Sequence, residues 1–411
     1  MKATKVLLQC IASAMLGVTG LTGSIAAGEP DTRAVTPEQL VSPAPAHSHL
    51  SRVTSDDTGT VYLSWVTERD GVAEFAFASW DGSTWSDPAI ISKGTDWFVN
   101  WADFPRLAVH GDARLAHWLR RSGSSSYDYD VVASFYDPSR QRWGDGTLIN
   151  TDGIQAEHGF VAMAPSGPHR TLITWLDGRR TKSEPEPGPM TLRGAEFAST
   201  GERLDEWELD SRVCDCCQTA AAMTNRGPIV VYRNRSPGDI RDIAIVRRVD
   251  GQWTKPQAVH DDGWQVAGCP VNGPAVAARE NTVAVVWFTL LDDLPVVQLA
   301  VSRDDGEHFT APTRVAGADT LGRVDVTLLD NGEIITSWLD LRGSSAQVML
   351  SRYSAEAEFI DTVEVAPILA SRRSGFPSIH SVGNTVYVSW TQVSDANRVK
   401  VARVAYSGPS S

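Results

Sequence analysis

Hydrophobic and polar positions alternate along most of the chain with the two-residue period that is typical of β-strands. One version of this pattern recurs, in which small and apolar residues alternate and end in an aromatic residue. The aromatic residues of its seven copies are Trp65, Trp118, Trp175, Tyr232, Trp287, Trp338 and Trp390. They are separated by 53, 57, 57, 55, 51 and 52 residues. Each interval accommodates four short antiparallel strands with their turns, which is the size of one β-propeller blade.

The other strands of each blade can be placed around these copies. An inner strand is expected shortly before the aromatic strand, as in Phe104–Val109 and Phe376–Ile379, and a third strand shortly after it, as in Glu74–Ser79. The outer strand is expected to carry a proline, as in Trp85–Pro88, because proline offers no hydrogen-bond donor to a strand beyond the edge. The last repeat lacks this outer strand, because the chain ends too soon.

The segment that the last repeat lacks is found near the start of the chain. Val35–Val41 matches the outer-strand pattern and precedes the first inner strand. We therefore predict an all-β fold, a seven-bladed β-propeller of four-stranded antiparallel blades, in which residues 32–42 complete the last blade and remove its open edge. The alternative is a six-bladed propeller with one repeat as an appendage. Residues 28–411 are expected to form this single domain.

The first 27 residues have the features of an export signal. Lys2 and Lys5 form a positively charged start, an apolar run extends from Val6 to Gly23, and Ser24–Ala26 offers a small-residue cleavage site. We predict a periplasmic or secreted monomer with no membrane span once the signal is removed. A retained membrane anchor is the alternative interpretation.

The composition agrees with a fold of many short strands. The 411 residues include 14 Trp, 33 Gly and 22 Pro, which favours strands and turns over long helices. The net charge is −13, and no stripe of basic residues interrupts it. An acidic protein of this kind repels phosphate backbones, so we exclude nucleic acid as a partner.

A short motif connects the chain with a known superfamily. Ser302–Phe309 has the pattern Ser-x-Asp-x-Gly-x-x-aromatic, and shortened versions occur at Ser79–Trp85 and Val249–Trp253. It resembles the Asp-box of the sialidase-like (bacterial neuraminidase repeat) propellers, in which the motif forms a turn between the third and fourth strands. The resemblance implies a sialidase site with three arginines that hold a sugar carboxylate, a Tyr–Glu nucleophile pair and an Asp acid. Phe104–Arg106 loosely resembles the segment that carries the first of those arginines, and no tyrosine is assigned.

Cysteines are expected to meet on one face of the propeller. If each inner strand begins at the top face, the residues before it gather there, because neighbouring strands are antiparallel. Cys214, Cys216 and Cys217 precede the fourth inner strand, and Cys269 precedes the fifth. The repeat register therefore predicts that four sulfur atoms lie close together beside the central channel.

Two kinds of chemistry fit this cluster. Two disulfides suit an exported protein, although Cys269 can pair with only one of the three clustered cysteines and the remaining two are close in sequence. Alternatively, the cysteines bind a soft metal ion such as copper or zinc as thiolates, or they are redox-active. Inert thiols are the remaining interpretation. His47, His49 and His158 precede inner strands as well and are candidate additional ligands.

The residues that follow the aromatic strands are rich in aspartate and arginine. Leu176–Arg179 recurs as Leu339–Arg342. Such pairs either brace neighbouring blades or form a basic rim for an anionic ligand. In the second case the ligand-binding residues are Arg106, Arg179, Arg233, Arg235 and Arg342. The candidate acids or bases are then Asp177, Asp340 and Glu157.

Three functions follow from these candidates. The first, which we favour because the cysteine grouping sets this chain apart, is a non-hydrolytic exported propeller that binds a small ligand or a metal ion through its cysteine cluster. The second is a sialidase-like glycoside hydrolase that acts on an anionic sugar. The third is a scaffold that docks a protein partner, with the cysteines as structural disulfides.

Overall fold

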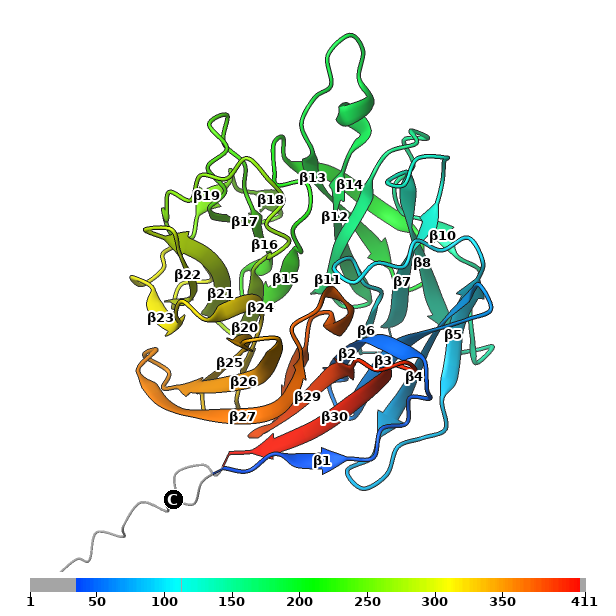
Figure 1. The fold of residues 1–411 in the computed structure, drawn as a ribbon. Helices are drawn as coiled ribbons and strands as arrows, with labels where there is room; N and C mark the ends of the chain where they lie inside the picture. Colours follow the sequence, from blue (N-terminus) through cyan, green and yellow to red (C-terminus); the bar gives the residue numbers. More distant parts are fainter. Residues whose placement is uncertain (1–34, 112, 407–411) are drawn as a thin grey trace, which may run out of the picture. The chain divides into compact units, whose positions relative to one another are not determined.

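The computed structural model describes residues 35–111 and 113–406, which form seven antiparallel sheets arranged in a ring (Figure 1). Blade 1 contains β2 (Ser48–Ser55), β3 (Val61–Arg69), β4 (Val72–Trp80) and β5 (Ala89–Gly94). Blade 2 contains β6 (Arg106–His110), β7 (Ala113–Arg121), β8 (Tyr129–Asp137), β9 (Arg142–Trp143) and β10 (Thr147–Leu148). Blade 3 contains β11 (His158–Gly167), β12 (Arg170–Asp177), β13 (Thr191–Ala198) and β14 (Arg203–Asp210). Blade 4 contains β15 (Ala220–Thr224), β16 (Gly227–Arg233), β17 (Ile243–Val249), β18 (Gln252–Trp253) and β19 (Gln257–Ala258). Blade 5 contains β20 (Ala275–Arg279), β21 (Thr282–Leu291), β22 (Leu294–Ser302) and β23 (Thr313–Ala316). Blade 6 contains β24 (Thr320–Leu328), β25 (Ile334–Arg342), β26 (Ser345–Tyr353) and β27 (Phe359–Leu369). Blade 7 contains β28 (Ser378–Val382), β29 (Thr385–Gln392), β30 (Arg398–Ala405) and β1 (Glu38–Leu40).

The ring confirms the predicted seven-bladed propeller, and the six-bladed alternative is wrong because every repeat forms a sheet of its own. The seventh sheet has the order β1-β30-β29-β28, so the N-terminal strand completes the last blade as predicted. Glu38, Gln39 and Leu40 pair with Arg403, Ala402 and Val401. Residues 32–34 of the predicted closing segment lie outside the described residues.

The outer strands of blades 1 and 5 differ in one detail from the expectation. They begin directly after the proline of the motif rather than containing it: β5 starts at Ala89, after Pro88, and β23 starts at Thr313, after Pro312. The proline fixes the backbone just before the edge strand, where no ladder hydrogen bond is needed from its nitrogen. In blades 2 and 4 the outer part is divided into two short strands.

The recurring aromatic residues form the core between blades. All seven lie in the second strand of their blade and are buried, and Trp175 and Trp287 have no exposed surface. Apolar side chains of adjacent blades pack together. For example, Trp65 of blade 1 lies in one hydrophobic cluster with Val399 and Val401 of blade 7. Burial of apolar surface between sheets, worth about 25 cal/mol per Å², holds the blades side by side.

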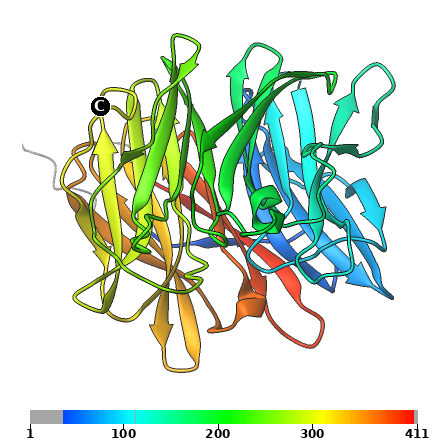
Figure 2. The ribbon, with the colours of Figure 1, turned by 90° about the horizontal axis from the view of Figure 1, so that it is seen from above.

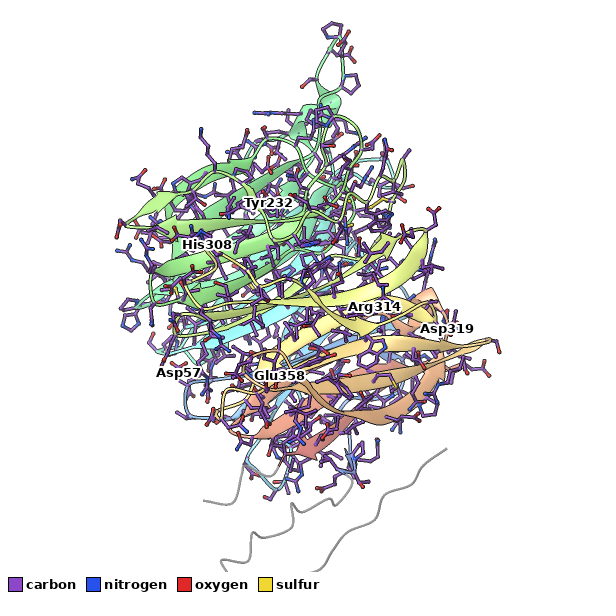
Figure 3. The ribbon with its side chains drawn as sticks, turned by 90° about the vertical axis from the view of Figure 1, so that its left-hand side faces the viewer. Asp57, Tyr232, His308, Arg314, Asp319 and Glu358 are labelled. Carbon is purple, nitrogen blue, oxygen red and sulfur yellow. A yellow bond between two sulfur atoms is a disulfide. The ribbon has the colours of Figure 1, made fainter. Side chains whose placement is uncertain are left out.

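The turn at Ser302–Phe309 lies between the third and fourth strands of blade 5. Asp304 accepts a hydrogen bond from the His308 backbone at 2.9 Å and from the Ser302 hydroxyl at 2.7 Å, and Gly306 adopts a φ of 81°. Figure 3 places His308 on the same side of the propeller as Asp57 and on the opposite side from Asp319, which precedes an inner strand. The turn therefore lies away from the face where inner strands begin, and it stabilises the fold rather than a site.

The described residues are strands, turns and two short 3₁₀ helices, η1 (Arg179–Lys182) and η2 (Arg372–Ser374). Figure 2 shows the strands of the ring from its edge. Within residues 35–111 and 113–406, no helix has the length and apolar character needed to cross a bilayer. The predicted export signal, residues 1–27, lies outside the described residues, and so do residues 28–34.

Candidate functional site

A basin of about 440 Å³ opens on the face where the inner strands begin. We call it the top basin. The aromatic residues that line it are Phe98, Trp101, Tyr127, Tyr129 and Phe160. Its polar lining includes Glu157, Asp215 and Arg372, and the disulfide of Cys216 and Cys269 lies at its edge. A concave site of this size with aromatic walls and a few convergent polar groups is typical of small-molecule binding.

A chain of hydrogen bonds connects the top basin with the interior. The Tyr129 hydroxyl lies 2.9 Å from Glu157 Oε1 and 3.2 Å from Asp103 Oδ2, while Asp103 Oδ1 accepts the backbone N–H of Phe160 at 2.8 Å. A hydroxyl has a single hydrogen to donate. Its contact with two carboxyl groups therefore favours a structure in which one of them carries a proton.

Burial raises the pKa values of Asp103, Glu157 and Tyr129, which favours their protonated forms. Desolvation, with a smaller contribution from the charge of Glu157, raises the pKa of Asp103 to about 7. Desolvation and the nearby charge of Asp215 raise the pKa of Glu157 to about 7, against the effect of the Tyr129 hydrogen bond. The pKa of Tyr129 lies well above its ordinary value because the ring is buried beside both carboxyl groups. Glu157 is partly exposed to the top basin and can therefore exchange a proton with a ligand near neutral pH.

The propeller topology explains why these residues meet. Tyr129 begins the third strand of blade 2, and Glu157 directly precedes the inner strand of blade 3, so both lie at the top face. The two residues form a bridge between their backbones, and Tyr129 stacks on Phe98 with ring centroids 4.0 Å apart. Gly159 leaves room for Asp103, because a Cβ there would lie 2.0 Å from Asp103 Oδ2. The position of the tyrosine is thus fixed by packing on several sides.

Charged residues from more distant blades complete the lining. The Asp215 carboxylate accepts hydrogen bonds from Arg235 Nη1 at 2.9 and 3.2 Å. Arg372 comes from η2, before the inner strand of blade 7, and its guanidinium carbon lies 5.8 Å from the centroid of the Trp101 ring. In the part of the chain that the structure describes, Arg372 forms no salt bridge, so its charge is available to an anionic ligand.

The four cysteines meet as the repeat register predicts. Cys216 and Cys269 form a disulfide between blades 4 and 5, while Cys214 and Cys217 are buried thiols with their Sγ atoms 3.1 Å apart. One of the two expected disulfides is therefore present, and the two remaining cysteines are a pair that is close in sequence. A soft metal ion at this cluster, copper or zinc, stays a prediction.

The three candidate histidines have other surroundings. His47 is exposed, and His49 Nε2 lies 3.2 Å from Glu68. His158 is buried, with Nε2 3.0 Å from Asp152 Oδ2 and Nδ1 3.2 Å from the carbonyl oxygen of Tyr129. Burial lowers the pKa of His158, but the carboxylates of Asp152 and Asp177 outweigh it and raise that pKa above its ordinary value. His158 thus supports the loop beneath the top basin.

Asp177 is fully buried and does not line the top basin. It accepts hydrogen bonds from the Trp175 indole at 2.8 Å and from Arg179 Nε at 2.7 Å. Arg179 Nη2 also lies 3.0 Å from Asp152, so this guanidinium neutralises the acidic group around His158. These contacts join residues of blade 3 and of the loop before it, so the bracing of neighbouring blades by this aspartate–arginine pair stays a prediction.

The other predicted rim residues are also engaged within the protein. Arg233 is buried and donates to backbone carbonyls, and Arg235 pairs with Asp215 and Asp239. Arg342 pairs with Asp340 and Glu364 at an exposed position of blade 6. Of the predicted acids and bases, Glu157 lines the top basin, whereas Asp177 and Asp340 do not.

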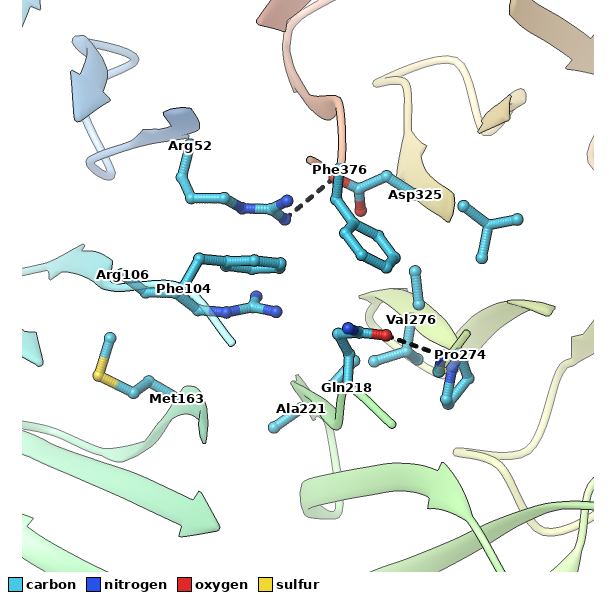
Figure 4. Close-up of a pocket in the computed structure, with 14 residues that line it drawn as sticks. Arg52, Phe104, Arg106, Met163, Gln218, Ala221, Pro274, Val276, Asp325 and Phe376 are labelled. Carbon is cyan, nitrogen blue, oxygen red and sulfur yellow. Dashed lines mark hydrogen bonds and ion pairs between the residues drawn. The ribbon is translucent and has the colours of Figure 1, made fainter. Parts of the chain in front are cut away.

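Arg106 lies in the central channel, outside the lining of the top basin (Figure 4). The guanidinium groups of Arg52 and Arg106 lie 4.9 and 5.1 Å from the ring of Phe104, and Arg52 also contacts Asp325 at 3.2 Å. Among the described residues, the Nε of Arg106 is buried without a hydrogen-bond partner. Arg106 lines two cavities of the channel, which measure about 80 and 240 Å³.

The sequence alone did not identify Asp103, Tyr129, Trp101 or Arg372 as site residues. It also did not identify Asp215 as a candidate acid. Asp103 and Trp101 lie in the same pre-strand segments that supplied the cysteines and Glu157, so the register contained a signal for them. Tyr129 lies at the start of a third strand, a position that also reaches the top face but that the sequence pattern does not single out.

Comparisons with known proteins support the fold. The polysaccharide lyase Uly1 superposes with a TM-score of 0.51 at 9% identity, covering 92% of this chain and 94% of that one. A PL25 ulvan lyase bound to a sugar fragment gives 0.45 at 12% identity, covering 77% and 79%. An α-L-arabinanase from Penicillium chrysogenum gives 0.46 at 12% identity, covering 90% and 97%. At these identities the likeness concerns the propeller fold alone.

No protein-family model matches the chain, and no curated protein matches it.

Proposed function

We propose that the protein hydrolyses a glycosidic bond of an acidic saccharide in the top basin. The observation that carries the proposal is the chain Asp103–Tyr129–Glu157, which ends in a partly exposed carboxyl group with a pKa of about 7. A polysaccharide lyase shares the fold, which makes saccharides the first class of ligand to test. Flat aromatic side chains such as Trp101 and Tyr127 suit the apolar faces of sugar rings.

Two carboxyl groups in one basin suit the chemistry of glycoside hydrolysis. Glu157 is the general acid that protonates the leaving oxygen, because its raised pKa keeps a proton available near neutral pH. Asp215 is the carboxylate held in place by Arg235, and it acts as the base that activates water. After each turnover Asp215 releases to solvent the proton that it took from water, and Glu157 takes a proton from solvent, because both carboxyl groups are partly exposed in the top basin. Tyr129 holds the Glu157 carboxyl group in place through its hydroxyl.

Arg372 supplies the preference for an acidic sugar. Its guanidinium lines the basin without an acidic partner among the described residues, and a carboxylate can accept two parallel hydrogen bonds from it. Hydrolysis is proposed rather than a lyase reaction because the basin offers two carboxyl groups, Glu157 and Asp215, while the Tyr129 side chain is only 1% exposed.

Glu157→Gln tests the assignment of the acid. The variant keeps the size and the hydrogen bond to Tyr129 but has no proton to give, so kcat is expected to fall by about 10²–10⁴-fold with little change in KM. Activity is measured by chromatography of labelled acidic oligosaccharides. In the wild-type protein kcat should decrease tenfold per pH unit above about pH 7, because Glu157 loses its proton there.

Glu364→Gln is the matched control, because Glu364 pairs with Arg342 at an exposed position of blade 6 and does not line the basin. It should retain full activity. An unsaturated product, detected by its ultraviolet absorbance, would indicate a lyase and overturn the hydrolytic step. The proposal also fails if no acidic oligosaccharide is cleaved, or if Glu157→Gln is fully active.

A further inference from the structure

The cysteine cluster contains a disulfide and a dithiol in direct proximity. The Sγ atoms of Cys214, Cys216 and Cys217 all lie within 4.8 Å of one another, and Cys216 is bonded to Cys269. Cys214 and Cys217 have the spacing Cys-x-x-Cys and a sulfur–sulfur distance of 3.1 Å. Each free thiol can therefore approach a bonded sulfur without a rearrangement of the propeller.

The surroundings of Cys214 favour a nucleophilic thiolate. Arg241 Nη1 lies 3.1 Å from Cys214 Sγ, and the buried guanidinium of Arg233 lies nearby. The hydrogen bond from Cys217, together with the backbone N–H of Cys216 and these two positive charges, lowers the pKa of Cys214 to about 6. Burial keeps the pKa of Cys217 well above its ordinary value, so this thiol retains its proton.

The same charges disfavour a bound cation. A metal ion between Cys214 and Cys217 would lie next to two buried arginines, and Cys216 and Cys269 have no free thiolates to offer while they are bonded to each other. A negatively charged sulfur beside two arginines is already neutralised, which is the usual environment of a reactive cysteine.

We propose that Cys214 and Cys217 are a redox-active dithiol that exchanges with the Cys216–Cys269 disulfide. In the first step the Cys214 thiolate attacks Cys216 Sγ, the Cys214–Cys216 bond forms, and the electron pair of the broken bond leaves on Cys269. Cys269 is exposed and takes a proton from water. In the second step Cys217 gives its proton to water and attacks Cys214 Sγ, and Cys216 leaves as a thiolate.

The net reaction moves one disulfide bond. Two electrons pass from Cys214 and Cys217 to Cys216 and Cys269, and no external oxidant or reductant is consumed. The exchange opens the covalent connection between the loops of blades 4 and 5 and places a free thiol at Cys269, on the edge of the top basin. The exchange does not depend on the proposed hydrolysis, and it is measured on the sulfur atoms themselves.

Disulfide mapping of the full-length protein tests the exchange. The protein is equilibrated in glutathione buffers, quenched with acid, alkylated after denaturation and analysed by peptide mass spectrometry. Two forms with a single bridge are expected, Cys216–Cys269 and Cys214–Cys217. Their ratio should not change with the potential of the buffer, because the two forms have the same oxidation state.

Labelling of the native protein with a maleimide separates the two steps. Cys269 should be labelled in the wild-type protein and at least about tenfold more slowly in Cys214→Ser, which lacks the attacking thiolate. Cys217→Ser still permits the first step, so Cys269 should be labelled and Cys214–Cys216 should accumulate. Circular dichroism verifies that both variants are folded.

The exchange is excluded if Cys216–Cys269 is the sole bridge under all buffers and Cys269 is never labelled. Two bridges in the same molecule under all buffers would show that the pairs oxidise independently and would also exclude it. Stoichiometric copper or zinc that protects Cys214 and Cys217 from alkylation would also exclude the exchange. That result would support the metal site that the sequence suggested.

Discussion

Arg233 illustrates how this propeller accommodates a charged side chain in its interior. Its guanidinium donates to the carbonyl oxygens of Asn272 at 2.8 and 3.0 Å, Arg241 at 2.6 Å and Phe288 at 2.6 Å, and it lies 4.8 Å from the ring of Trp264. The accepting groups belong to blades 4 and 5. One arginine thus connects the backbones of two blades at the place where the cysteine cluster lies.

Replacement of this side chain should be costly. Arg233→Ala leaves several buried carbonyl groups without donors, so the free energy of unfolding is expected to fall by about 3 kcal/mol or more. Arg342→Ala is the matched control, because its ion pairs with Asp340 and Glu364 are exposed and should contribute less than about 1 kcal/mol. Denaturant titration measures both, and equal losses would contradict the bracing role.

The loops before the inner strands of blades 4 and 5 approach each other backbone to backbone. A Cβ added at Gly273 would lie 2.0 Å from the carbonyl oxygen and 2.6 Å from the nitrogen of Gln218. The Gln218 side chain also accepts the Gly273 N–H at 2.9 Å and donates to the Ala102 carbonyl at 2.7 Å. The packing of these loops holds together the segments that carry the cysteine cluster and line the top basin.

A single methyl group should disturb this contact. Gly273→Ala is expected to lower the free energy of unfolding by about 1–3 kcal/mol, because the backbone of one loop must move away from the other. Gly268→Ala in the same loop should have little effect, because its Cβ would meet only Val266 Cγ2, at 3.9 Å. Thermal unfolding followed by circular dichroism compares the two, and a Gly273→Ala protein as stable as the wild type would show that the loops can separate freely.

The whole propeller is closed by strand β1. Besides its pairing with β30, Glu38 accepts two hydrogen bonds from the guanidinium of Arg403, at 2.8 and 3.0 Å. Without β1, the N–H and C=O groups along one side of β30 would face solvent as an open edge.

Deletion of residues 35–41 should therefore lower the melting temperature and cause concentration-dependent association through the edge of β30. Size-exclusion chromatography and thermal unfolding measure the two effects. Glu38→Ala, which removes only the exposed ion pair and keeps the strand, should remain monodisperse and lose less than about 1 kcal/mol. A deletion variant that is as stable and monodisperse as the full chain would show that closure is dispensable.

The periodic part of the structure was accessible from the sequence, and the site was accessible only in part. Spacing of Trp65, Trp118 and their equivalents specified the blades, and the register placed Cys216 beside Cys269 because each precedes an inner strand. Arg372 also precedes an inner strand, so the register could place it at the top face, but the path of its loop, which brings it to Trp101, is not periodic. The partners of Arg233 are backbone carbonyls, which carry no residue-specific signal.

Closure of the ring has a consequence for the time course of folding. Glu38 and Arg403 are 365 residues apart, so nearly the whole polypeptide must be synthesised before they can meet. Bringing together two residues so far apart in the sequence costs loop-closure entropy before the contact stabilises the fold. Such contacts therefore form late. The pairing of β1 with β30 is therefore expected to form after the pairing of β28, β29 and β30, which follow one another in the chain. Until β1 pairs, β30 is the open edge at which a folding intermediate meets proteases and chaperones.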